Sequence, residues 1–104
     1  MEDRKNWRKI TSLLANSSEA ELQILLDLFL TPHERKTLIG RFDLIVELLN
    51  AKLSQREISG KLGQSISKIT AGSKAIQILK EKERQFLLEK MKVKIGRSDG
   101  IKKS

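Results

Sequence analysis

Apolar residues recur at intervals of three and four along most of this chain, which is the period of an α-helix that buries one face. Runs that alternate apolar and polar residues, as half-buried strands do, are almost absent. The commonest residue types include Leu, Ile, Lys, Glu and Arg, which suit helices. We therefore expect an all-α fold.

The first predicted helix covers residues 1–15. It carries one apolar stripe, formed by Trp7, Ile10, Leu13 and Leu14. We expect Trp7 in the core, and stacking on a nucleic-acid base is the alternative role for this side chain.

The second predicted helix is apolar on nearly every side. Ser18 and Glu21 form a capping box at its start, and it extends from about Glu19 to Leu30. Its apolar residues are Leu22, Ile24, Leu25, Leu26, Leu28, Phe29 and Leu30. A helix that is apolar all round is buried all round. A chain of 104 residues is too small to bury it alone, so we expect a second copy of the chain to cover it.

The third predicted helix has the clearest start. Thr31 is the expected N-cap, Pro32 the first helical residue, and Glu34 completes a capping box. Apolar residues then recur on one face as far as about Asn50, at Leu38, Phe42, Ile45, Leu48 and Leu49.

A helix-turn-helix is predicted over about residues 54–79. Ser54 and Glu57 form a capping box for a short helix that ends at Gly63, and Ser65 caps a second helix. Four residues at helical spacing are expected to point inward across the break, namely Ile58, Leu62, Ile66 and Ile69. Ser59 is expected to be the small residue where the two helices cross.

A last helix is predicted from Glu81 to about Val93, with Phe86, Leu87 and Met91 as its apolar anchors. Residues 96–104 are polar and basic, and we expect a disordered tail. We therefore expect residues 1–95 to form a single all-helical domain, whose binding partner the charges below indicate to be DNA.

Charge narrows the class of partner. The chain has 21 basic and 13 acidic residues, a net charge of +8. Residues 52–74 hold five basic residues and one acidic residue, and residues 92–104 hold the same numbers, so each segment carries +4. A basic helix-turn-helix with a basic tail is typical of a protein that binds duplex DNA.

Other classes of function lack their residues. The chain has no Cys and one His, so no thiolate or multi-histidine metal site is expected. No catalytic spacing is recognisable, and His33 is expected to be solvated, so we do not expect an enzyme. No apolar run is long enough for a transmembrane helix and no signal core follows the N-terminus, so we expect a cytoplasmic protein.

Several blocks of sequence resemble the bacterial Trp repressor family, over about residues 22–90. They are Leu30-Thr31-Pro32-His33-Glu34-Arg35, Arg41, Ile45-Val46-Glu47-Leu48-Leu49, Leu53-Ser54-Gln55-Arg56-Glu57-Ile58 and Ile69-Thr70-Ala71-Gly72-Ser73. The resemblance implies an intertwined homodimer of six-helix subunits. It also implies a repressor that binds a palindromic operator in double-stranded DNA.

The resemblance assigns DNA contacts to the two helices of the predicted helix-turn-helix. Carried onto this chain, the contact residues are Gln55, Arg56, Ile66, Ser67, Lys68 and Thr70. A guanidinium such as that of Arg56 binds a guanine edge through two hydrogen bonds. The polar and basic side chains suit phosphate contacts.

The resemblance also implies L-tryptophan as a corepressor. The contacts carried onto this chain are Leu28, Leu30, Thr31, Arg41 and Gly72. Of the family's two Arg side chains that sandwich the indole, Arg41 is kept and the second is Ala71 here. A Ser that meets the polar end of the ligand is Ala75 here. Lys74 is the candidate to replace the lost charge.

These departures leave alternatives open. The leading hypothesis is a repressor whose affinity for DNA rises with tryptophan. The runner-up is a DNA-binding regulator that needs no ligand or uses another one. A third hypothesis is a protein-binding module without a nucleic-acid role.

Overall fold

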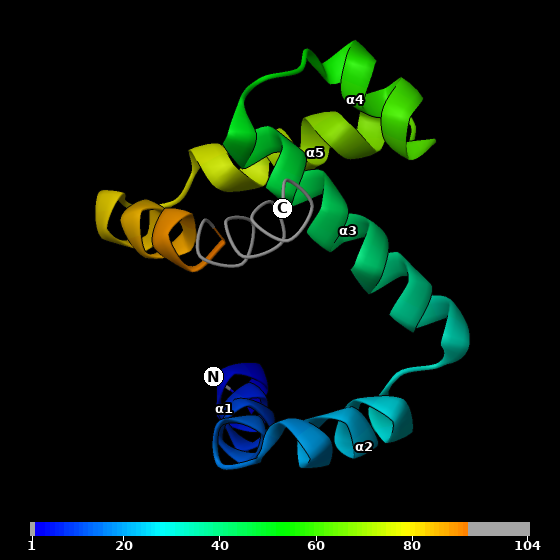
Figure 1. Cartoon of the computed structure of the whole chain (residues 1–104). Coiled ribbons are helices and arrows are strands. Elements are labelled where there is room, and N and C mark those ends of the chain that lie inside the picture. Colours follow the sequence, from blue (N-terminus) through cyan, green and yellow to red (C-terminus); the bar gives the residue numbers. More distant parts are fainter. Residues whose placement is uncertain (1, 92–104) are drawn as a thin grey trace, which may run out of the picture. The chain divides into compact units, whose positions relative to one another are not determined.

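The computed structural model describes residues 2–91, and every regular element in that range is helical. The helices are α1 (Glu2–Ala15), α2 (Glu19–Phe29), α3 (Pro32–Asn50), α4 (Gln55–Leu62) and α5 (Ile66–Gln77) (Figure 1). A sixth helical stretch covers residues 81–91. The all-α prediction is confirmed, while the predicted tail, residues 96–104, lies outside the described residues.

The helices begin where the capping residues predict. The Ser18 side chain accepts a hydrogen bond from the Glu21 N–H at 3.2 Å, and the Glu21 carboxylate accepts one from the Ser18 N–H at 2.8 Å. Ser54 and Glu57 repeat this reciprocal pair at the start of α4. These bonds satisfy N–H groups that have no partner inside the helix.

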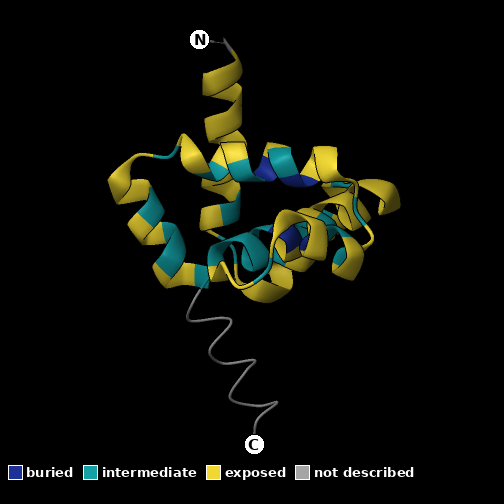
Figure 2. Cartoon of the chain, turned by 90° about the horizontal axis from the view of Figure 1, so that it is seen from above, coloured by how far each residue is buried: buried dark blue, intermediate teal, exposed yellow. Residues whose placement is uncertain are grey.

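The chain divides into two compact units between Leu38 and Ile39. The first unit contains α1, α2 and the first turns of α3, and none of residues 3–38 is buried (Figure 2). Trp7 is 64% exposed, so its predicted place in the core is wrong for a single chain. The apolar stripe is present, but no element of this unit covers it.

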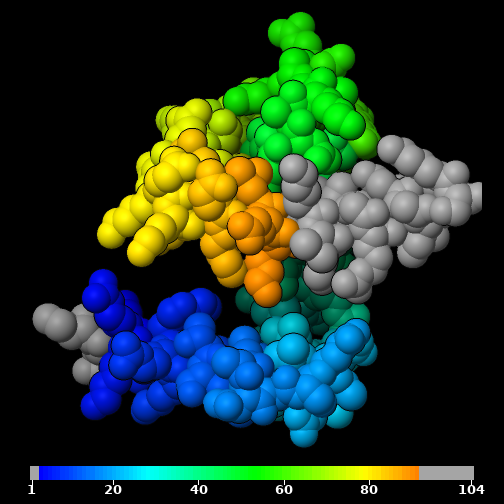
Figure 3. All heavy atoms as spheres, turned by 60° about the vertical axis from the view of Figure 1, so that its left-hand side comes forward, coloured from blue at the N-terminus to red at the C-terminus, as the bar shows by residue number. Residues whose placement is uncertain are grey.

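The second unit holds the buried core of the described residues. Leu44 of α3, Ile58 of α4 and Ile69 of α5 meet there, and both isoleucines are 0% exposed. Leu48, Leu53 and Leu62 pack around these three. In the space-filling view the green residues of α3 and α4 lie against the yellow residues of α5 (Figure 3).

Gly72 lets α5 approach α3 closely. It is buried, and a Cβ atom placed on it lies 2.9 Å from Leu44 Cδ2 and 3.4 Å from Leu48 Cδ1. A separation under 3.0 Å is too short for two carbon atoms, so only glycine fits without a shift. Glycine at position 72 therefore lets the side chains of Leu44 and Leu48 pack against the backbone of α5.

The turn between α4 and α5 uses two local devices. Gly63 ends α4 in the left-handed conformation, with φ of 66°, which favours glycine. The Ser59 hydroxyl donates a 2.6 Å hydrogen bond to the Gln64 carbonyl. Ser59 was predicted as a small residue at a helix crossing, and the structure gives its hydroxyl this additional role across the turn.

Two apolar residues of this unit are not buried as predicted. Ile66 is 47% exposed because it is the first residue of α5 and no element of the unit covers that end. Phe86, a predicted anchor of the last helix, is 61% exposed, whereas Leu87 and Met91 are half-buried. Within residues 2–91, no helix is long and apolar enough to cross a membrane.

We predict opposite effects of alanine at two helical glycines. Gly72→Ala lowers the free energy of unfolding by about 1–3 kcal/mol, because its Cβ overpacks the core. Gly60→Ala raises it by about 0.5–1 kcal/mol, because a Cβ there meets nothing and alanine favours the helix. Urea denaturation of both variants measures the difference. A stabilising Gly72→Ala contradicts the close approach of α5 to α3.

The lowered pKa of Glu34 makes part of the free energy of unfolding depend on pH. Hydrogen bonds from Thr31, chiefly its backbone N–H at 2.9 Å, hold the pKa of the Glu34 carboxyl below its usual value, and His33 lowers it further. Because the folded-state pKa is the lower one, the carboxylate stabilises the fold at neutral pH. This contribution is lost as the pH falls through the folded-state pKa.

We therefore expect the natural chain to be more stable than Glu34→Gln at neutral pH, with the difference shrinking toward pH of about 3. Glutamine keeps the acceptor oxygen but carries no charge, which makes it the matched substitution. Urea denaturation at both pH values measures the two differences. A difference that does not change with pH argues against the charged cap.

Candidate nucleic-acid interface

The residues assigned to DNA contact lie at the starts of α4 and α5. Gln55 and Arg56 are in the first turn of α4, and Ile66, Ser67 and Lys68 are in the first turn of α5. All five are exposed, and all belong to the second unit. The exposure of Ile66, which is wrong for a core residue, suits a side chain that touches a base.

Thr70 connects the two groups. Its hydroxyl donates a 3.3 Å hydrogen bond to the Gln55 amide oxygen, from α5 to α4. This bond uses the oxygen of the amide, so the N–H groups of Gln55 are the ones directed to another acceptor. A phosphate oxygen is an acceptor of this kind. The geometry thus joins two residues that are 15 positions apart in the chain.

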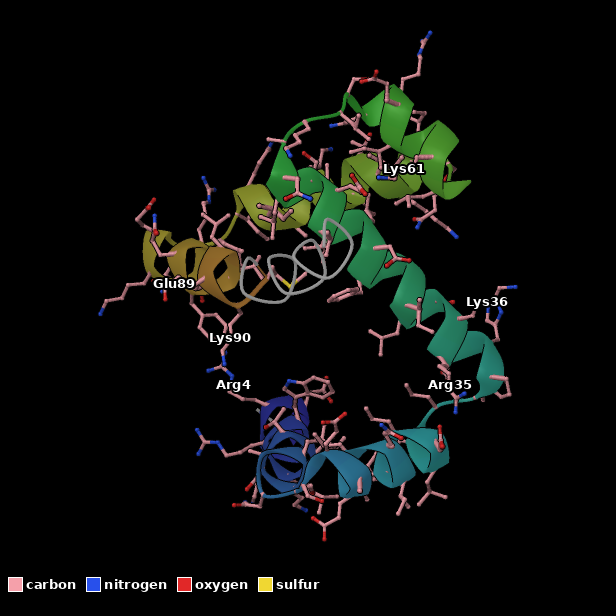
Figure 4. All side chains as sticks on the ribbon, viewed as in Figure 1. Arg4, Arg35, Lys36, Lys61, Glu89 and Lys90 are labelled. Atoms are coloured by element: carbon pink, nitrogen blue, oxygen red, sulfur yellow. The ribbon has the colours of Figure 1, made fainter. Side chains whose placement is uncertain are left out.

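The basic residues of this surface have two different environments. Lys61 of α4 forms a 2.7 Å ion pair with Glu47 of α3, whose side chain is 17% exposed (Figure 4). Within residues 3–91, no ion pair involves Arg56 or Lys68. Arg56 and Lys68 are therefore available to an anion, while Lys61 joins α4 to α3.

The start of α5 presents a positive dipole end. Ser65 is the N-cap, and its side chain accepts a 3.2 Å hydrogen bond from the Lys68 N–H. The N–H groups of Ile66 and Ser67 have no acceptor inside the helix, because the first turn lacks the preceding carbonyls. Such a helix start attracts phosphate.

The residues assigned to tryptophan fall in both units. Leu28, Leu30 and Thr31 surround the connection from α2 to α3 in the first unit, and Arg41 and Gly72 lie in the second. The Thr31 hydroxyl accepts the Glu34 N–H at 3.1 Å. The neighbouring Arg35 pairs with Asp27 across the same connection (Figure 4). These contacts explain the local fold without a ligand.

Of the second group, Arg41 is exposed, and no ion pair within residues 3–91 involves it. Gly72 has a packing role, since it lies against Leu44. Ala71 and Ala75 are both exposed and lie one turn apart on α5. Lys74 lies in the last turn of α5, where a cation also stabilises the helix dipole.

Sequence patterns missed three contacts around these helices. The Gln64 amide donates a 2.9 Å hydrogen bond to the Gly40 carbonyl of α3. Arg84 donates from Nη2 to the carbonyls of Ile76 and Gln77 at 3.4 and 3.3 Å, which caps the end of α5. The third is the ion pair of Lys61. An Arg soon after a helix end signals the Arg84 cap, but no local pattern marks the Gln64 bond.

The structure also places the residue types considered for acid–base catalysis and for metal binding. His33 is exposed in the first turn of α3. Within residues 2–91, no group of three His, Cys, Asp or Glu residues is placed to hold a metal ion.

Comparison with known proteins gives one consistent result. The sequence model described as "Trp repressor protein" matches residues 5–91. A protein of Aliivibrio salmonicida named "Trp operon repressor homolog" is 35% identical over 99 residues, which are 94% of this chain and 92% of that protein. A protein of Vibrio parahaemolyticus with the same name is 37% identical over 84 residues, 80% of this chain and 82% of that protein.

We predict that Arg56→Ala weakens binding to a duplex selected by the unmodified chain from a random DNA library. The expected loss is about 1–3 kcal/mol, with relaxed preference at one base position. Fluorescence anisotropy at fixed salt measures it, since salt alone changes such affinities. Arg8→Ala, an exposed arginine of α1, is the matched control. Equal affinity of all three proteins contradicts the assignment of Arg56 to a base contact, and failure of the unmodified chain to select any duplex favours the protein-binding module instead.

Proposed function

This chain belongs to the Trp repressor family, and we propose that it is a homodimeric transcriptional repressor that binds a palindromic operator. The observation that carries the proposal is the surface formed by the first turns of α4 and α5. It brings together Gln55, Arg56, Ile66, Ser67, Lys68 and Thr70 in one unit. The family model spans both units of the chain, which supports a single functional domain over residues 1–95.

The helix-turn-helix formed by α4 and α5 reads the DNA. In this proposal Arg56 binds a guanine in the major groove through two hydrogen bonds. Gln55, Ser67, Lys68 and Thr70 bind phosphates and fix the position of the protein on the duplex. Ile66 adds an apolar contact of the kind that a thymine methyl group accepts.

The exposed apolar surface of the first unit supports the proposed homodimer. Its apolar side chains, Ile24 and Leu28 of α2 among them, are exposed in a single chain. A second copy related by a two-fold axis supplies matching apolar surface. The two recognition helices then lie about 34 Å apart, one turn of DNA. A repressor of this kind acts in the cytoplasm, where the bacterial chromosome lies.

We further propose L-tryptophan as the corepressor, bound by Leu28, Leu30, Thr31, Arg41 and Gly72. Arg41 supports this part, because its guanidinium is exposed and can stack on an indole and meet a carboxylate. The names of the two relatives refer to the trp operon, which agrees with a tryptophan ligand.

Ala71 and Ala75 favour a second candidate, a DNA-binding regulator that needs no ligand or uses another one. Neither side chain can form an ion pair or a hydrogen bond. A lost carboxylate contact alone removes about 1.5–3 kcal/mol. Lys74 is exposed on the same helix and is the available replacement charge.

Two measurements separate these candidates. The first is operator binding with and without saturating L-tryptophan, for which we expect tighter binding with the ligand. No change in affinity removes the corepressor and leaves the repressor. The operator is the palindrome selected by the unmodified chain.

The second is calorimetry of L-tryptophan with the natural chain and with the double variant Ala71→Arg, Ala75→Ser. We expect the double variant to bind at least about tenfold more tightly, because it regains a charged hydrogen bond. Both substituted positions are exposed, so the fold tolerates them. Equal affinity shows that the natural chain does not depend on these contacts.

A further inference from the structure

Two polar contacts join α3 to the α4–α5 pair. The Gln64 side-chain amide, in the turn between α4 and α5, donates to the Gly40 carbonyl at 2.9 Å. The Lys61 ammonium, near the end of α4, donates to the Glu47 carboxylate at 2.7 Å. All four residues belong to the second unit, so their arrangement is defined.

Both contacts lie on the same face of α3. Residues 40 and 47 are seven positions apart, which is nearly two full turns and about 10.5 Å along the axis. Leu44 lies between them and packs against Gly72 of α5. One face of α3 therefore has an apolar contact in its middle and a polar contact at each end.

Gln64 is held on two sides. Its own carbonyl accepts the Ser59 hydroxyl at 2.6 Å, and its amide reaches Gly40. Gly40 has no side chain to block the approach, and a Cβ there lies 3.3 Å from Gln64 Nε2. A helix carbonyl has a second lone pair for such a donor. The bond thus needs an amide at position 64, and a Cβ at position 40 would force that amide to move by a few tenths of an ångström.

Building on the proposed function, we propose that Gln64 is a positioning residue, which holds the DNA-reading helices on α3 before any ligand binds. Apolar contact is not directional, and three side chains, Leu44, Ile58 and Ile69, form the buried core. A hydrogen bond is directional and sets the orientation of the turn. An α4–α5 pair that already has its binding orientation binds DNA more tightly, since the apparent affinity scales with the fraction of molecules that are competent to bind.

The hydrogen bond from Gln64 to Gly40 also affects how strongly a ligand can regulate DNA binding. A corepressor that raises DNA affinity must favour the binding-competent orientation of α4 and α5, and Gln64 favours that orientation without a ligand. It therefore raises DNA binding of the ligand-free protein and narrows the range that a ligand controls.

The first test is hydrogen–deuterium exchange of the full chain without DNA or ligand. Gln64→Met keeps the side-chain length and removes the donor. We expect exchange in residues 55–77 to quicken about three- to tenfold, the effect of losing one hydrogen bond. Amides of α3 serve as the internal reference, because a general loss of stability quickens them equally. Exchange that rises equally in α3, or not at all, overturns the proposal.

The matched control is Gln85→Met. Gln85 also donates from its amide, but to Glu81 one turn away at 3.0 Å, so it joins no separate helices. We expect exchange in residues 55–77 to stay at the natural rate in this variant.

A double-mutant cycle tests the partner carbonyl. Gly40→Ala crowds the Gln64 amide and should quicken exchange of residues 55–77 by itself. In the Gln64→Met background it should add nothing, because the shared contact is already lost. Additive effects of the two substitutions contradict the contact.

The second test is DNA affinity without ligand, measured on a duplex selected by the natural chain. We expect Gln64→Met to bind about three- to tenfold more weakly and Gln85→Met to bind as the natural chain does. Quicker exchange with unchanged affinity overturns the positioning role. If the natural chain selects no duplex, the proposed function fails, while the exchange result still judges the Gln64 contact.

Discussion

The approach of α5 to α3 at Gly72 is the contact on which the second unit depends. With no side chain at this position, Leu44 and Leu48 of α3 reach the backbone of α5. Ile69, one turn earlier on α5, can then share a core with Ile58 of α4. A Cβ atom at Gly72 would lie 2.9 Å from Leu44 Cδ2, so Leu44 or α5 would have to shift. The packing of α5 against α3 therefore depends on the absence of a side chain at this position.

Charge is divided between two tasks in this unit. Lys61 is paired with Glu47 and helps to attach α4 to α3. Arg56 and Lys68 lie at the starts of α4 and α5 and are exposed. Of the five basic residues over positions 52–74, Lys61 is therefore used inside the unit, and the other four are in no ion pair within the described residues. The structure distinguishes cations that hold the helices from cations that can bind phosphate.

The helix starts were predictable because they depend on residues three positions apart. Ser54 and Glu57 make contacts that any sequence of this pattern makes when it begins a helix. The six residues assigned to DNA contact lie on α4 and α5, and their role in DNA binding stays a prediction. The contact from Thr70 to Gln55 could not be predicted, because it needs the folded pair of helices.

Two other features could not be predicted from local patterns: which apolar faces are covered, and which residues far apart in the chain form hydrogen bonds. Periodicity identified an apolar stripe on α1, yet it cannot tell which element covers the stripe, and Trp7 is 64% exposed. The same reason explains why Phe86 and Ile66, which were predicted to point inward, are exposed. The bond from Gln64 to Gly40 joins residues 24 positions apart, and neither a glutamine nor a glycine in the sequence predicts it. Such contacts depend on the angle at which helices cross, which a local pattern does not contain.

The absence of buried residues between positions 3 and 38 has a consequence for the lifetime of the protein in the cell. Under the proposed homodimer, a newly made chain keeps these apolar side chains in water until it meets another copy. Chaperones and proteases recognise such surface, and a few kcal/mol of stability change abundance severalfold. Chains that have not yet met another copy are then cleared first. The amount of assembled protein would rise more steeply than in proportion to the synthesis rate, because pairing of identical chains depends on the square of their concentration.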